Sequence, residues 1–142
     1  LAAIEALLPH RKVVRYTQAN ETNVLDAEVL LIDCFGLLSS IYHYATVSYV
    51  GGGFGVGIHN VLEAAVWGIP VIFGPNNQHF QEAQELKQAK GGFEITDEAS
   101  FDTLLSQFET DADGLRQTGD AAGRYVESKV GAVENILSKI IF

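Results

Sequence analysis

The sequence predicts an α/β protein with a Rossmann-like, doubly wound parallel sheet of about five strands flanked by helices. Two observations support this prediction. Short runs of β-branched and aliphatic residues alternate with longer segments of helical periodicity, which is typical of βαβ units. Several of the short runs are apolar without alternation, as expected for strands that are covered on both faces.

Five segments share the composition of strands. They are Val13–Tyr16, Val29–Ile32, Val47–Val50, Val71–Phe73 and Phe93–Ile95. The second, third and fourth are largely apolar, so we expect them to form the centre of the sheet.

Six segments between and after these strands have the spacing of amphipathic helices. They are Leu37–Ala45, Asn60–Trp67, His79–Ala89, Ala99–Phe108, Leu115–Ser128 and Val130–Ile141. Asp97 and Asp111 stand where N-caps are expected. We interpret the acidic run Glu109–Asp113 as a solvated turn and first helical turn. The last predicted helix has an apolar face that we expect to pack onto a neighbour.

Composition restricts the class of protein. The chain has 142 residues, of which 47% are hydrophobic and 19% charged, the profile of one packed domain rather than of a disordered chain. A net charge of −9 argues against broad binding to nucleic acid or to anionic membranes. The single Cys34 suits a reducing, cytosolic setting. No apolar run approaches the roughly 18 residues of a membrane span. Because methionine is absent, we expect the chain to be a fragment.

A glycine loop follows Val47–Val50 directly. Its glycines are Gly51, Gly52, Gly53, Gly55 and Gly57. Without a Cβ, such a backbone can turn sharply and approach a ligand closely. The predicted helix that begins at Asn60 would place its N-terminus beside the loop, an arrangement suited to anions. The glycine spacing fits neither the dinucleotide-binding fingerprint nor the P-loop.

Three residues after the loop are candidates for ligand contact. Asn60 and Glu63 have the spacing of a capping box, and ligand binding is an equal alternative. The ring of His59 is expected to project into the glycine loop, where a phosphate could bind. Two further loops, Asp33–Leu37 and Gly74–Gln78, also follow predicted strands. Because ligands bind at the carboxyl ends of parallel strands, we expect all three loops to line one crevice.

The spacing of these motifs resembles that of a known family. The residues that carry the resemblance are Asp33-x-x-Gly36, Tyr42, Val50-Gly51-Gly52, His59-Asn60-x-Leu62-Glu63-Ala64, Pro70-Val71, Gly74-Pro75 and Phe80. This pattern is similar to the carboxyl-terminal domain of the Kdo transferases. They are GT-B glycosyltransferases that move 3-deoxy-D-manno-octulosonic acid (Kdo) from CMP-Kdo to lipid A precursors in Gram-negative bacteria.

The resemblance implies that residues 1–142 are a nucleotide-sugar-binding domain, one half of a GT-B fold. The acceptor-binding domain, the catalytic base and the membrane contact would lie in an amino-terminal part outside the chain. The implied reaction is an inverting, metal-independent transfer of Kdo in lipopolysaccharide synthesis, on the cytoplasmic side of the inner membrane. No cofactor, metal or nucleic acid is expected, and the fragment alone is expected to be soluble and inactive.

The resemblance also implies a set of substrate-binding residues. They are Gly36, Leu37, Gly52, Gly53, Phe54, His59, Asn60, Glu63 and Asn76. Gly36 and Leu37 would approach the cytosine through the backbone. Gly52, Gly53 and His59 would lie near the phosphate or sugar, and His59 is the one candidate catalytic residue within the chain. Asn60 and Glu63 would bind the ribose or fix the loop.

Some positions depart from the family pattern. Leu37, Gly53 and Asn76 stand where the family commonly has glutamate, serine and histidine. These departures keep two alternatives open. One is a GT-B enzyme or epimerase that uses a UDP-sugar, and the other is a nucleotide-binding module without chemistry of its own.

Overall fold

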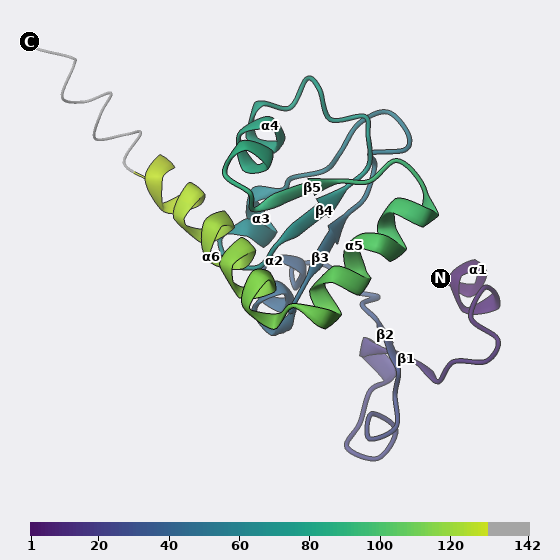
Figure 1. The fold of residues 1–142 in the computed structure, drawn as a ribbon. Helices are drawn as coiled ribbons and strands as arrows, with labels where there is room; N and C mark the ends of the chain where they lie inside the picture. Colours follow the sequence, from purple (N-terminus) through teal and green to yellow (C-terminus); the bar gives the residue numbers. More distant parts are fainter. Residues whose placement is uncertain (131–142) are drawn as a thin grey trace, which may run out of the picture. The chain divides into compact units, whose positions relative to one another are not determined.

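The computed structural model describes residues 1–130, which belong to two compact units (Figure 1). Unit 1 is Leu1–Ile41, and unit 2 begins at Tyr42. The fold class is the predicted α/β class, with parallel strands flanked by helices. Within residues 1–130, five strands form one sheet of two strands and another of three.

Unit 1 contains the two-stranded sheet. Its elements are α1 (Ala2–Ala6), β1 (Val13–Arg15), the 3-10 helix η1 (Tyr16–Gln18), β2 (Val29–Leu31) and α2 (Leu38–Ile41). Strands β1 and β2 are parallel, with Val13 opposite Val29. The guanidinium of Arg15 donates from Nε and Nη2 to the two carboxylate oxygens of Glu5, over 2.7 and 2.6 Å. This bidentate pair joins α1 to the end of β1.

The loop after β2 is fastened within unit 1. Asp33 accepts hydrogen bonds from the backbone N–H and the hydroxyl of Thr17, at 2.9 and 2.6 Å. These bonds stabilise the ionised form and hold the pKa of Asp33 below its ordinary value. Gly36, further along the loop, has a φ of +86°, a conformation that glycine adopts without the strain that a Cβ would cause.

Unit 2 contains the three-stranded parallel sheet and the longer helices. Its elements are η2 (Tyr42–Tyr44), β3 (Ser48–Val50), α3 (Leu62–Ala65), β4 (Val71–Phe73), α4 (Gln81–Gln88), β5 (Gly92–Glu94), α5 (Glu98–Thr110) and α6 (Ala112–Lys129). The strand order is β3-β4-β5. Ile72 of β4 lies opposite Tyr49 of β3 on one side and Phe93 of β5 on the other.

The central strand β4 separates two layers of side chains, because neighbouring residues of a strand point to opposite faces. Val71 and Phe73 pack with buried residues of α3, α4 and α6. Ile72 packs on the other face with Phe108 of α5. The sheet of unit 2 therefore lies between helices on both faces (Figure 1), and its loops project beyond the strand ends.

The strand predictions are confirmed in number and differ in detail. The expected central position holds for β4, in which every residue is buried. It is wrong for Val29–Ile32, because β2 pairs with β1 in a two-stranded sheet and Leu30 is 44% exposed. In β3, Tyr49 is 46% exposed, so the predicted burial on both faces is also wrong there. An apolar run indicates that a strand can be buried, and the neighbouring elements decide whether it is.

The helix predictions hold best for the longer helices. Asp97 accepts from the backbone N–H of Ser100 as the N-cap of α5, and Asp111 accepts from the N–H of Gly114 as the N-cap of α6. The acidic run ends α5 and begins α6. The helix α1 was not predicted. The predicted helix over Val130–Ile141 lies, apart from Val130, outside the residues that the structure describes.

Two of the shorter helix predictions are corrected. The predicted helix over 37–45 is divided into α2 and the 3-10 turn η2. The one over 60–67 is reduced to the four residues of α3, because Asn60 forms a turn before it and residues 66–68 form a turn after it. Among the described residues, no helix combines the length and the apolarity that crossing a membrane requires.

Candidate functional site

The glycine loop after β3 folds back on itself in unit 2. The carbonyl of Gly52 accepts hydrogen bonds from the N–H groups of Gly55 and Gly57, at 2.9 and 3.3 Å, and the carbonyl of Gly51 accepts from the N–H of His59 at 3.0 Å. Gly52 has a φ of +91° and Gly57 a φ of +142°. Both values lie in the region that side chains rarely adopt, so the loop requires glycine at these two positions.

The second loop, after β4, lies directly against the glycine loop. A Cβ added to Gly53 would lie 2.6 Å from the backbone N and Cα atoms of Gly74, so these backbones touch. Asn76 then holds the contact through two hydrogen bonds. Its backbone N–H donates to the carbonyl of Gly53 at 2.8 Å, and its side-chain Nδ2 donates to the carbonyl of Gly55 at 2.5 Å. The predicted convergence of these two loops is therefore confirmed.

The ring of His59 lies against the glycine loop, as predicted. A Cβ added to Gly52 would lie 3.4 Å from Cδ2 of the His59 ring, and one added to Gly51 would lie 3.8 Å away. The imidazole therefore covers the backbone at the start of the glycine loop. It is also exposed, so a ligand at the loop would be within reach of its nitrogen atoms.

Asn60 and Glu63 do not form the predicted capping box. The Asn60 Oδ1 accepts from the N–H of Leu62 at 3.0 Å instead of from residue 63, and its Nδ2 donates to the Glu63 carboxylate at 3.1 Å. The local turn at Asn60 competes with helix formation, which is why α3 begins two residues later than predicted. With one turn of helix, α3 has a small macrodipole.

The electrostatics around Glu63 involve Tyr42, which belongs to the sequence pattern that carries the family resemblance. The pKa of Tyr42 is raised, first because the phenol is partly buried and second because the negative charge of Glu63 opposes its ionisation. Tyr42 therefore lies within electrostatic reach of Glu63, and its hydroxyl keeps its proton at neutral pH.

A cavity of about 380 Å³ lies between residues 58–62 and the start of α4. His59, Asn60 and Glu82 contribute its polar groups, and Phe80 contributes an aromatic ring. Sites for small molecules typically have volumes of ~300–1,000 Å³ and a few converging polar groups in an apolar lining. Glu82 was not among the predicted site residues. The signal that could have found it is its position in the first turn of the helix that follows the loop after β4.

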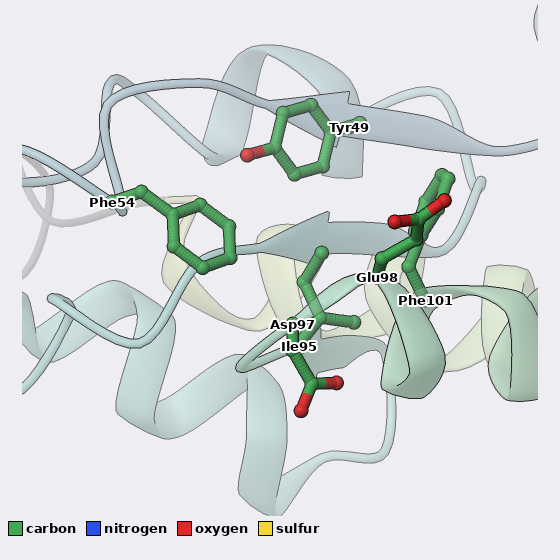
Figure 2. Close-up of a pocket in the computed structure, with 6 residues that line it drawn as sticks. All are labelled: Tyr49, Phe54, Ile95, Asp97, Glu98 and Phe101. Carbon is green, nitrogen blue, oxygen red and sulfur yellow. The ribbon is translucent and has the colours of Figure 1, made fainter.

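Phe54 is not among the residues that line this cavity; it lines a second one of about 350 Å³. Figure 2 shows the rings of Tyr49 and Phe54 facing the same space as Ile95, while the Asp97 carboxylate points away from it. Phe101 closes the side formed by α5 and makes an edge-on contact with Tyr49, with 6.2 Å between ring centroids. Tyr49, Ile95 and Phe101 were not among the predicted site residues, since their proximity depends on how α5 packs on the sheet.

The predicted site residues divide between the two units. Unit 2 brings together Gly52, Gly53, Asn76 and His59, with Asn60 and Glu63 beside them. Gly36 and Leu37 lie in unit 1, and their place at the same crevice stays a prediction. Within residues 1–130, no group of three or more His, Cys, Asp or Glu side chains has the geometry to hold a metal ion.

No protein-family model matches the chain. Individual proteins do match. A 3-deoxy-D-manno-octulosonic acid transferase from Aquifex aeolicus is 39% identical over 85 residues, which are 58% of the chain. A second transferase of this name, from Rickettsia typhi, is 36% identical over 67 residues, or 47% of the chain. The chain is related to the Kdo transferases. The matched segments are 24% and 14% of those two proteins, so the chain spans about a quarter or less of the curated Kdo transferases that it matches.

A solved structure extends the relationship to the fold. It is the C-terminal CMP-Kdo binding domain of WaaA from Acinetobacter baumannii, which matches with a TM-score of 0.75 at 20% sequence identity. The match covers 88% of the chain and 67% of that domain structure. The chain therefore has the same fold as that C-terminal domain.

Proposed function

We propose that the chain is the donor-binding domain of a Kdo transferase and that it binds CMP-Kdo through the glycine loop and the cavity beside His59. The 85-residue relationship to a Kdo transferase carries this proposal. The geometry supports it, because the two loops of unit 2 place glycine backbone and the His59 imidazole at one end of the sheet, and Glu63 and Glu82 lie on the helices that follow these loops. Hydroxyl groups, a phosphate and a planar base find suitable partners among these groups.

The proposed reaction exchanges one bond to the anomeric carbon of Kdo for another. An acceptor hydroxyl attacks this carbon from the face opposite the phosphate, the bond to the phosphate oxygen breaks, and CMP leaves with the electron pair. The acceptor proton passes to a base that we place in the amino-terminal part of the enzyme, outside this chain. Within the chain, His59 and the backbone of the glycine loop would stabilise the charge on the departing phosphate.

The acceptor and the location of the reaction belong to the same proposal. A lipid A precursor would bind to the amino-terminal part, which would also contact the cytoplasmic side of the inner membrane. The transfer would be inverting and independent of metal ions. The surface of the present chain suits this division, because a net charge of −9 repels anionic lipid headgroups.

Nucleotide titration tests the proposal. We expect CMP added to the isolated chain to move the backbone amide signals of Gly52, Gly53 and His59 in NMR spectra, and calorimetry to give a tighter affinity for CMP than for UMP. NAD serves as the negative control, since the glycine spacing does not fit a dinucleotide site. A preference for UMP would favour a UDP-sugar-using enzyme, and no binding of CMP at millimolar concentration would contradict the proposal.

Glu63→Gln examines the ribose contact. The glutamine side chain can still accept the hydrogen bond from Asn60, so the melting temperature should stay close to that of the original chain. If the carboxylate binds ribose hydroxyls, CMP affinity should fall by ~1.5–3 kcal/mol, the range for a hydrogen bond to a charged group. The exposed Glu109→Gln on α5 is the matched control and should bind CMP normally. Unchanged affinity together with a lower melting temperature would assign Glu63 a purely structural role.

A further inference from the structure

The loop after β4 contains a buried side chain that the donor site does not use directly. Asn77 is 0% exposed. Its Nδ2 donates to the carbonyl of Gly74 and to the carboxylate of Glu94, both over 2.9 Å. Its Oδ1 accepts from Nε2 of Gln84 at 2.6 Å and from Nζ of Lys87 at 3.0 Å. Both donors and both acceptor positions of this amide are therefore occupied.

The partners of Asn77 come from three different elements. Gly74 directly follows β4, Glu94 ends β5, and Gln84 and Lys87 lie one turn apart on α4. Lys87 also donates to Glu94 over 2.8 Å, so two of the three side chains around Asn77 are bonded to each other as well as to Asn77. Lys87 first, and Asn77 second, hold the pKa of Glu94 below its ordinary value, so Glu94 is a charged acceptor at neutral pH. We call Asn77, Gln84, Lys87 and Glu94 the Asn77 hub.

Asn77 directly follows Asn76, whose hydrogen bonds shape the glycine loop. Asn76 donates its backbone N–H to Gly53 and its side-chain Nδ2 to Gly55. Asn77 fixes the backbone on the other side of the peptide group that joins these two residues. The Asn77 backbone adds two bonds that close the turn, from its N–H to Pro75 and from the Phe80 N–H to its carbonyl. A rotation of this segment would move Asn76 and with it the two carbonyls of the glycine loop.

We propose that Asn77 is a positioning residue, which sets the shape of the glycine loop by locking the loop after β4 to β5 and α4. For donor binding this inference rests on the proposed function, whereas the coupling between the two loops does not. An amide is the group that suits the position, because it supplies two donors and two acceptor sites in one buried plane. Leucine fills similar space but removes all four of these side-chain hydrogen bonds, and the loss of buried hydrogen bonds is unfavourable.

The first test measures loop shape without any ligand. In Asn77→Leu and in the milder Lys87→Met, we expect the NMR amide signals of Gly53, Gly55 and Asn76 to move away from their original positions. Tyr125→Phe is the matched control. It removes the 2.7 Å hydrogen bond from Tyr125 to Glu85. Glu85 also lies on α4, but this bond does not connect α4 to the loop after β4. This control should lower the melting temperature and leave the glycine signals in place.

The second test measures ligand affinity. Asn77→Leu should weaken CMP binding at least tenfold, Lys87→Met less, and Tyr125→Phe not at all. Glu94→Gln keeps an oxygen acceptor for Asn77 and Lys87, so it should retain more affinity than Glu94→Leu. Glycine signals that stay in place in both hub variants, or CMP affinities equal to that of Tyr125→Phe, would overturn the inference. If the original chain binds no CMP, the proposed function fails and the glycine signals alone decide on the coupling.

Discussion

Gly53→Ala is predicted to damage the site, and the same change two residues later is predicted to be harmless. A Cβ at position 53 would lie 2.6 Å from Gly74, whereas one at position 55 would meet only the Gly52 carbonyl, at 3.6 Å. Neither Gly53 nor Gly55 has a positive φ. The two substitutions therefore differ only in the space available to one methyl group.

The expected loss of stability in Gly53→Ala follows from these distances. Ordinary contact begins at 3.4 Å, so the two backbones must separate by about 0.8 Å. Gly74 is held by the buried strand β4, and the glycine loop must move instead. Both hydrogen bonds from Asn76 would then lengthen beyond their useful range, at roughly 0.5–1.5 kcal/mol each. We expect a total loss of about 1–3 kcal/mol in the free energy of unfolding, in line with overpacking elsewhere.

Thermal unfolding measured by circular dichroism provides the comparison. For a chain of this size, Gly53→Ala should lower the melting temperature by roughly 3–12 °C. Gly55→Ala should leave it unchanged or raise it slightly, because alanine restricts the unfolded chain. CMP affinity should fall for Gly53→Ala alone. Equal melting temperatures and equal affinities for the two variants would refute the tight contact between the loops.

Three further predictions concern a cap, a charge and the imidazole. Asp111→Ala should lower the stability of unit 2 by ~1 kcal/mol because α6 loses its N-cap, whereas Asp111→Asn should keep it; equal urea midpoints for the two would contradict this. Hydrogen bonds from Lys129, Tyr125 and Gln81 lower the pKa of Glu85 from 4.5 to about 2. Its contribution to stability is thus complete above pH 4.5 and lost as the pH falls toward 2, and Glu85→Gln should show a shallower loss of stability in urea unfolding across that window. His59→Ala should weaken CMP binding while leaving the melting temperature within about 2 °C, because an exposed side chain contributes little to stability; a large drop in melting temperature would instead make the ring structural.

The sequence predicted those parts of the fold that depend on neighbouring residues. Asp97 and Asp111 cap their helices as expected, because capping bonds span only three residues. Val71–Phe73 is the buried central strand, as its unbroken apolar run indicated. The same kind of run gave a wrong prediction of a central strand at Val29–Ile32, since burial depends on what covers a strand. The predicted helix start at Asn60 was also wrong, because the preference of Asn60 for a local turn competes with the helix.

Within the site, the sequence by itself determined that glycines, His59, Asn60 and Glu63 follow one strand and that a second loop follows the next. Parallel strands then require the two loops to emerge at the same end of the sheet. The tertiary structure alone decided which atoms touch: the close contact between the backbones of Gly53 and Gly74, the bonds from Asn76 to the glycine loop, and the complete burial of Asn77. These contacts join residues from separate loops and elements of the chain. The packing of α4 and β5 against the loop, rather than any local preference, brings them together.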